Sequence, residues 1–226
     1  MNDFILIGHR GACYYKPENT LSSFKYALKL KCPYIECDVR LTKDKQVVII
    51  HDKDLERTTN GYGLVSKFTL KELKKLDAGN KERIPTLQEL INLVKNKAKL
   101  VIELKKARNI IKETFKIIKK NKIENKVLIV SFHSSYLRKI KKLNPEIKTG
   151  LISRRTLLVI KRAELSKADL IGIYYRFVDK SLINKIHKNN FRVFAYERVT
   201  ENLSKNQIKR LINYGLDGIA LNKPIL

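Results

Sequence analysis

A histidine and an arginine directly follow the first apolar segment of the chain. Residues 4–8 read FILIG, and His9 and Arg10 come next. A short apolar run with β-branched residues predicts a buried strand, and parallel α/β folds place their functional groups at the carboxyl ends of strands. Arginine presents donors that match phosphate oxygens, and histidine exchanges a proton near neutral pH. The pair is therefore a candidate site for binding a phosphate group.

Two acidic residues share one face of the predicted strand at residues 34–41. Glu36 and Asp38 are two positions apart in an alternating segment, so their side chains point the same way. Neighbouring carboxylates repel each other unless a cation joins them, and hard divalent cations such as Mg2+ and Ca2+ prefer oxygen ligands. The pattern indicates a metal site, and a solvent-exposed polar strand face is the plainer alternative.

A third acid lies within another apolar segment. Glu103 is surrounded by Leu, Val and Ile at residues 100–104, and Lys105 follows two positions later. Burying an unpaired carboxylate is costly, so Glu103 needs a metal ion or a lysine as its partner. A simple ion pair between Glu103 and Lys105 is the alternative to a metal ligand.

A second histidine repeats the pattern of the first. His51 and Asp52 follow the apolar run at residues 47–50, so two of the four histidines end predicted strands. Two such histidines together with three acids favour acid–base chemistry. His133 and His187 have no such neighbours and are not assigned to the site.

Nine apolar runs of strand length recur along the chain, and helical patterns separate most of them. Thr69 and Thr86 are each followed three residues later by glutamate, which is the capping-box spacing of a helix start. Alternating strands and helices predict parallel βα units. The runs lie at residues 4–8, 34–41, 47–50, 100–104, 127–130, 149–152, 170–174, 192–196 and 218–221.

The link between the second and third runs is too short for a parallel crossover, so these two runs must form a hairpin. Placing Leu41 opposite Gln46 across a four-residue turn pairs Glu36 with His51 on one face. With the return strand set aside, eight units remain. We therefore predict an α/β fold, a TIM (β/α)8 barrel with a short hairpin and helical insertion after its second strand, and an open doubly wound sheet is the alternative.

The length and composition predict a single barrel domain over residues 1–226, with the insertion at approximately residues 42–85. No apolar run reaches 18 residues and the N-terminus lacks a signal-peptide pattern, so we expect a soluble, cytoplasmic protein. Cys13, Cys32 and Cys37 lack paired metal-ligand spacing and are expected to be reduced, structural thiols.

The charge of the chain is strongly positive. It has 48 lysines and arginines against 22 acidic residues, a net charge of +26 spread over the whole sequence. Lysine clusters such as Lys116, Lys119 and Lys120 alternate with apolar positions at helical spacing, which is typical of the solvated face of an amphipathic helix. Such a field also attracts anionic membranes or acidic substrates, so peripheral membrane contact stays open, whereas we do not expect a nucleic-acid partner.

A series of short motifs resembles the glycerophosphodiester phosphodiesterase family along essentially the entire chain. Each motif alone is weak, but their series and order are specific. They are His9-Arg10-Gly11, Pro17-Glu18-Asn19-Thr20, Glu36-x-Asp38, His51-Asp52, Arg57-Thr58-Thr59-Asn60-Gly61, Leu76-Asp77-Ala78-Gly79, Ile84-Pro85-Thr86-Leu87 and Glu103-x-Lys105.

The resemblance implies a TIM barrel enzyme that cleaves a small glycerophosphodiester into an alcohol and glycerol phosphate. In such an enzyme the two motif histidines, His9 and His51, act as acid and base. Arg10 and Lys105 contact the phosphate. One divalent cation, Mg2+ or Ca2+, is bound by three carboxylates, those of Glu36, Asp38 and Glu103.

The chain departs from the family pattern near its C-terminus. Where the family commonly has a Trp-Thr-Val-Asn pattern, this sequence has Tyr196, Glu197, Arg198 and Val199. Tyr196 can keep an aromatic wall at the substrate, whereas the two charged residues alter the pocket for the leaving alcohol. Two other functions stay open: a phospholipase D-like enzyme acting on lysophospholipids at a membrane surface, and a non-catalytic barrel that binds anionic polymers.

Overall fold

The computed structural model describes residues 4–226, so the first three residues of the predicted domain lie outside the described part. Eight parallel strands form a closed barrel, because β1 pairs with β2 on one side and β9 on the other. The predicted TIM barrel is confirmed, and the open doubly wound sheet is wrong. The barrel strands are β1 (Ile5–Gly8), β2 (Tyr34–Leu41), β4 (Lys99–Leu104), β5 (Val127–Ser131), β6 (Lys148–Ser153), β7 (Leu170–Tyr174), β8 (Arg192–Tyr196) and β9 (Gly218–Leu221).

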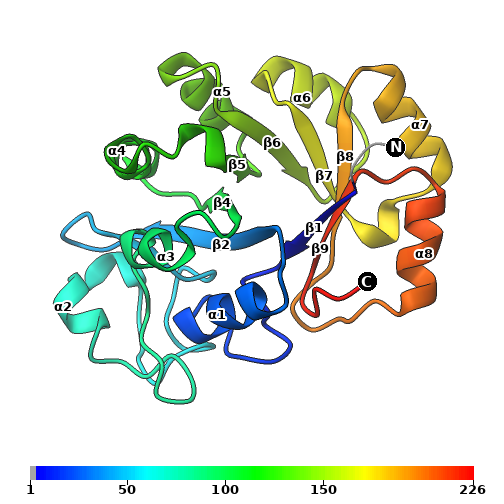
Figure 1. The fold of residues 1–226 in the computed structure, drawn as a ribbon. Helices are drawn as coiled ribbons and strands as arrows, with labels where there is room; N and C mark the ends of the chain where they lie inside the picture. Colours follow the sequence, from blue (N-terminus) through cyan, green and yellow to red (C-terminus); the bar gives the residue numbers. More distant parts are fainter. Residues whose placement is uncertain (1–3) are drawn as a thin grey trace.

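Helices surround the barrel on its outside (Figure 1). Several begin at side-chain caps that satisfy the free N–H groups of the first turn. Thr86 and Glu89 form the predicted capping box at the start of α3, and Thr20 accepts from the main chain of Ser23 at the start of α1. The outer helices are α1 (Leu21–Lys29), α3 (Leu87–Val94), α4 (Ile110–Asn121), α5 (Ser134–Leu143), α6 (Val159–Ser166), α7 (Lys180–Lys188) and α8 (Lys205–Asn213).

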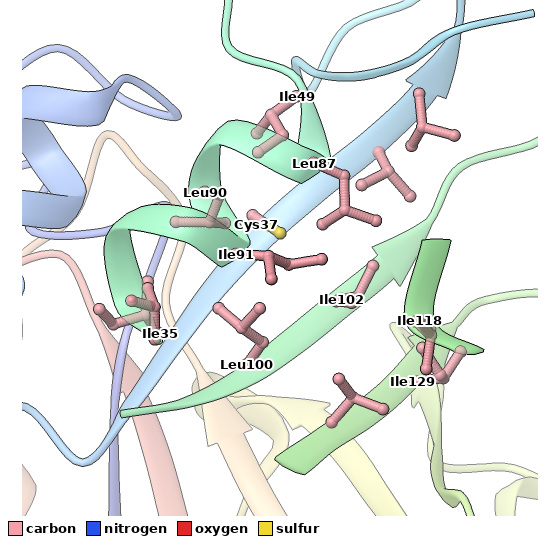
Figure 2. Close-up of a cluster of buried hydrophobic side chains, with 14 of the residues drawn as sticks. Ile35, Cys37, Ile49, Leu87, Leu90, Ile91, Leu100, Ile102, Ile118 and Ile129 are labelled. Atoms are coloured by element: carbon pink, nitrogen blue, oxygen red, sulfur yellow. The ribbon is translucent and has the colours of Figure 1, made fainter. Parts of the chain in front are cut away.

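Strand alternation divides the apolar residues into two layers. On β2 and β4, the outward-facing side chains Ile35, Cys37, Leu100 and Ile102 pack against α3, as Figure 2 shows. The barrel interior holds a separate apolar layer that includes Val101 on β4. The outward positions of these strands supply the aliphatic side chains that pack against the helices. The inward positions near the carboxyl ends are not needed for that packing and can carry polar residues.

The segment between β2 and α3 folds against the side of the barrel. It contains β3 (Val47–Ile49), the 3-10 turn η1 (Val65–Lys67) and the short helix α2 (Leu70–Leu73), which begins at the predicted Thr69–Glu72 capping box. Its own buried cluster fixes it in place; the members are Val48, Ile50, Leu55, Val65, Leu73, Ala78 and Ile84.

The predicted hairpin between β2 and β3 is present, but the predicted register is wrong by one residue. The structure pairs Leu41 with Val47, and the main-chain N–H of Thr42 donates to the carbonyl of Gln46 at 3.1 Å. The turn therefore has three residues, with Lys45 in the left-handed conformation at φ 60°. His51 is not paired with Glu36, and β3 ends two residues before it.

The lysines of the predicted clusters lie largely on helix surfaces. Lys116, Lys119 and Lys120 on α4 are exposed, whereas Ile118 on the same helix is buried. This arrangement confirms the amphipathic-helix interpretation. Within residues 4–226 no helix is both long enough and apolar enough to cross a lipid bilayer.

Candidate active site

The register of two neighbouring strands brings the three predicted acids together. Asp38 on β2 lies opposite Glu103 on β4, and Glu36 precedes Asp38 on the same inward face. Each of the three offers an oxygen within 4.8 Å of the others. All three are buried, with at most 8% of each residue exposed, so a solvent-exposed strand face is wrong.

Lysine and arginine offset only part of this buried negative charge. Lys105 Nζ lies 2.8 Å from Asp38 Oδ1 and also contacts Glu103 Oε1, so the predicted ion pair is present. Burial opposes ionisation of Asp38, but the charges of Lys105 and Arg10 overcome it and hold its pKa well below the usual range. Burial and repulsion from the other two carboxylates instead hold the pKa of Glu36 well above its usual range. The cluster therefore favours an additional cation.

The turn after β1 aims Arg10 at this cluster. Arg10 and Gly11 have φ angles of 50° and 87°, and a Cβ on Gly11 would lie 2.5 Å from Ser23 Oγ, so only glycine fits there. Ser23 Oγ donates to the Arg10 carbonyl at 2.9 Å and accepts from the N–H of Ala12 at 2.9 Å. In this conformation the Arg10 N–H donates to Glu36 Oε2 at 2.7 Å.

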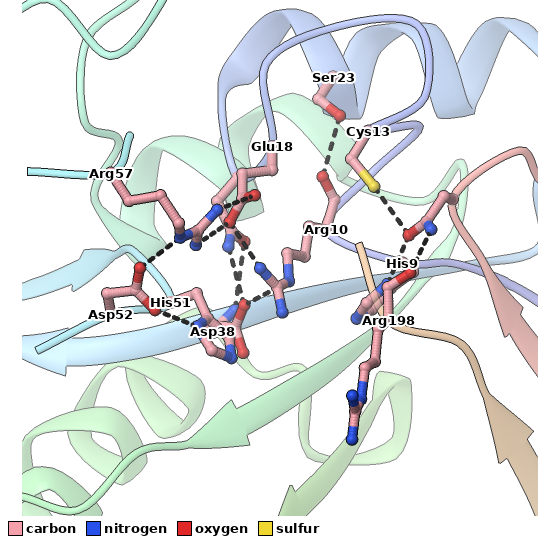
Figure 3. A network of polar contacts seen from close by, with 12 residues as sticks. His9, Arg10, Cys13, Glu18, Ser23, Asp38, His51, Asp52, Arg57 and Arg198 are labelled. Atoms are coloured by element: carbon pink, nitrogen blue, oxygen red, sulfur yellow. Dashed lines mark hydrogen bonds and ion pairs between the residues drawn. The ribbon is translucent and has the colours of Figure 1, made fainter. Parts of the chain in front are cut away.

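The guanidinium of Arg10 is held by acids on two sides. Its Nη1 donates to Glu18 Oε1 at 2.6 Å, and its Nε lies 3.4 Å from Asp38 Oδ2. Arg57 contacts the same Glu18 and also Asp52, which links the loop after β3 to this network (Figure 3). Arg10 is therefore fixed before any ligand arrives.

His9 is positioned by the far end of the chain. Its Nδ1 lies 2.7 Å from Oδ1 of Asn222, which directly follows β9. Burial, together with the charge of Arg10, lowers the pKa of His9 to about 4. The imidazole is therefore neutral near pH 7, with Nδ1–H donated to Asn222 and Nε2 available as an acceptor.

Glu197 fixes the main chain at Asn222. Its two carboxylate oxygens accept the main-chain N–H groups of Asn222 and Leu203, and the residue is 1% exposed. Burial raises the pKa of Glu197 to about 7. Glu197 thus acts as a hydrogen-bond acceptor that fixes the segment after β9, which carries Asn222, the partner of His9.

His51 has an acidic partner instead of a neutral one. Its Nδ1 lies 2.6 Å from Asp52 Oδ1, and Arg40 donates from Nε and Nη2 to its carbonyl at 2.9 and 2.6 Å. Burial lowers the pKa of His51, although the charge of Asp38 and the hydrogen bond to Asp52 oppose this shift. Arg40, on β2, therefore connects His51 to the strand that carries two of the acids.

A cavity of about 330 Å³ at the carboxyl end of the barrel joins these groups. His9, Arg10, Glu36, His51, Glu103, Lys105 and Tyr196 all line it, and Asp38 lies beneath them. The structure thus brings together every residue that the sequence assigned to the site. His133 and His187 are not among the lining residues.

Sequence reasoning assigned no role to Asn19, Arg40 or Asn222. Asn19 Nδ2 donates to Asp38 Oδ2 at 2.8 Å, and Asn19 was visible only as part of the motif at residues 17–20. Asn222 lies 213 residues from His9 and belongs to no motif noted in the sequence, so no local pattern could have found it.

The closed barrel and the polar cavity at the carboxyl ends of its strands place the chain among the TIM-barrel enzymes. The glycerophosphoryl diester phosphodiesterase family model matches residues 9–226. A glycerophosphodiester phosphodiesterase of Caldanaerobacter subterraneus is 38% identical, over 97% of this chain and 94% of that protein. One of Bacillus altitudinis is 33% identical, over 97% and 94% of the two chains.

A solved structure agrees with these sequence matches. The phosphodiesterase of Oleispira antarctica, in complex with the product sn-glycerol-3-phosphate, superposes with a TM-score of 0.87 at 32% identity, covering 97% of this chain and 93% of that one. This chain belongs to the glycerophosphoryl diester phosphodiesterase family.

Proposed function

We propose that this chain hydrolyses small glycerophosphodiesters to an alcohol and glycerol phosphate in a reaction that depends on a divalent cation. The observation that carries the proposal is the convergence of two histidines and three carboxylates on one cavity. The product bound to the Oleispira antarctica relative supports glycerol phosphate as the product here.

The donor set suits a hard divalent cation. Glu36, Asp38 and Glu103 supply oxygen ligands, which Mg2+ and Ca2+ prefer. Burial and repulsion from Asp38 and Glu103 raise the pKa of Glu36, and a bound cation would relieve that repulsion. When bound, the cation would neutralise the phosphate and favour attack at phosphorus.

Arg10 and Lys105 bind and orient the phosphate in this proposal. Both side chains line the cavity beside the acids, and both are at most 8% exposed. Because the contacts with Glu18 and Asp38 already fix Arg10, little side-chain entropy is lost on binding. Positive charge held at a dry site stabilises the additional negative charge of the transition state.

The two histidines divide the proton transfers. His9 is neutral with a free Nε2, so it accepts the proton of the attacking oxygen. Burial lowers the pKa of His51, but its hydrogen bond to Asp52 opposes this shift, and His9 has no acidic hydrogen-bond partner; we therefore assign to His51 the proton that is given to the departing alcohol. Tyr196, at the end of β8, lines the same cavity and would form an aromatic wall beside the substrate.

Identification of the broken bond tests the proposal. Purified protein is incubated with glycerophosphocholine or glycerophosphoinositol, whose alcohol is not glycerol, in water enriched in ¹⁸O, and the products are identified by mass spectrometry. We expect free alcohol and glycerol phosphate that carries the label. Free glycerol together with a phosphorylated alcohol, or no turnover with any diester and metal, would contradict the proposal.

A further inference from the structure

Two arginines line the part of the cavity formed by β6 and β8. Arg154 directly follows β6, and Arg198 lies two residues after β8. The Arg198 guanidinium lies 4.8 Å from the ring centre of Tyr174, and that of Arg154 lies 5.3 Å from the ring centre of Phe132. In Figure 3 the Arg198 side chain extends away from the network around Arg10.

These two arginines differ from the other cations of the cavity. Arg10, Arg57 and Lys105 are each in ion pairs with acids. Among residues 4–226, no carboxylate forms an ion pair with Arg154 or Arg198, which are both exposed. Aromatic rings support both guanidinium groups, and Arg154 also hydrogen-bonds the phenol of Tyr196. Since a guanidinium carries five N–H donors, both groups keep donors for an anionic ligand.

The acids near these arginines are already engaged. Glu201 contacts Arg176 at 3.1 Å and accepts from the hydroxyl of Tyr174. Glu197 is buried and accepts two main-chain N–H groups. Neither carboxylate neutralises the Arg154 or Arg198 side chain, so the mouth of the cavity keeps positive charge on this side.

Tyr196 connects the arginines to the acidic cluster. Burial raises the pKa of its phenol to about 12, while the charges of Arg154 and Arg198 act to lower it and that of Glu103 acts to raise it. The phenol is thus within electrostatic reach of all three groups. A diester with its phosphate beside Glu103 and Lys105 can extend its alcohol past Tyr196 toward the two arginines.

We propose that Arg154 and Arg198 form a subsite for an anionic group on the leaving alcohol, so that the chain prefers diesters whose alcohol carries a second phosphate. This inference rests on the proposed function. Guanidinium groups bind phosphate through paired, charge-assisted hydrogen bonds. An alcohol with a cationic head, such as choline, meets like charge at the same place.

A matched pair of substrates tests the subsite. Glycerophosphoinositol and glycerophosphoinositol 4-phosphate differ by one phosphate, and release of glycerol phosphate from each gives two values of kcat/KM. We expect the phosphorylated diester to be favoured about tenfold or more, as one good charged contact allows. In the variant R154Q/R198Q this ratio should fall to near one. R155Q removes the same charge from the neighbouring exposed residue, which does not line the cavity, and should keep the ratio.

Equal ratios in the native protein and in R154Q/R198Q would overturn the subsite while leaving the proposed function intact. Calorimetric titration of inositol 4-phosphate, the leaving alcohol itself, is independent of turnover. We expect the native protein to bind it about tenfold more tightly than R154Q/R198Q does. Equal affinity for the two proteins would overturn the inference even if neither diester were cleaved, whereas failure to cleave any diester would count against the proposed function.

Discussion

The Nδ1 atom of His9 lies 2.7 Å from Oδ1 of Asn222, a contact that joins the first barrel strand to the last. Asn222 itself is held by Glu197, whose carboxylate accepts its main-chain N–H, and by the carbonyls of Arg198 and Glu201, which accept from its Nδ2. Closing the barrel therefore also orients the imidazole, because β9 brings Asn222 beside β1.

Asn222→Ala is expected to lower kcat about 10- to 100-fold, because the imidazole loses the acceptor that fixes its orientation and tautomer. KM should change less, since Asn222 does not line the cavity. Steady-state kinetics on a soluble diester measures both. Asn213→Ala, at an exposed position on α8, is the matched control. A higher KM with an unchanged kcat would indicate that Asn222 acts on substrate binding and not on His9.

His9→Ala and His51→Ala should each reduce kcat about 10²- to 10⁴-fold, the usual contribution of an acid–base group. His133→Ala, outside the cavity, should keep native turnover. Thermal unfolding of each variant shows whether the barrel remains folded. Native kcat in either of the first two variants would exclude that histidine from proton transfer.

The buried neutral state of His9 predicts a dependence of stability on pH. The pKa of this group is about 4 in the folded protein and about 6.5 when unfolded, so between these values the unfolded chain binds the additional proton. The contribution of His9 is therefore complete above pH 6.5 and is lost as the pH falls toward 4.

Urea unfolding of the native protein and of His9→Gln measures this effect. Between pH 7 and pH 5 the native protein should lose about 2 kcal/mol more than the variant. Titration of the other groups affects the unfolding free energy of both proteins equally, so it cancels when the two are compared. Parallel losses would mean that His9 keeps an ordinary pKa in the folded barrel.

The exposed lysines of α4 should govern attraction to anionic surfaces without affecting catalysis. Neutralising Lys116, Lys119 and Lys120 to Gln should weaken binding to vesicles that contain phosphatidylserine, and added salt should weaken it in the native protein, because exposed charges are screened over about 8 Å at physiological ionic strength. The kcat on a soluble diester should not change. Vesicle binding that responds neither to the substitutions nor to added salt would identify these lysines as an ordinary solvated surface.

Local patterns in the sequence were sufficient for much of the fold. The capping boxes at Thr69 and Thr86 and the alternation of β2 depend on neighbours a few residues away, and these predictions are confirmed. The hairpin register was missed because Lys45, which is not a glycine, adopts the left-handed conformation that shortens the turn to three residues.

The candidate site was predictable to the extent that strands carry its side chains. Glu36, Asp38 and Glu103 sit on inward positions of two strands, and pairing of those strands brings them together. Arg40 is on β2, but it contacts the carbonyl of His51 in the segment after β3, and Asn222 lies in the segment after β9. The paths of these two segments depend on tertiary packing, so both contacts required the structure.

Dependence on the divalent cation gives the most direct test of the proposed chemistry. Protein stripped by a chelator is assayed for release of glycerol phosphate from glycerophosphoglycerol, before and after Mg2+ or Ca2+ is returned, and Glu36→Gln is assayed in parallel. We predict that stripping abolishes release, that one of the two cations restores it, and that Glu36→Gln requires more cation or stays inactive. Full turnover by the stripped protein, with no response to either cation, would contradict a metal-dependent phosphodiesterase.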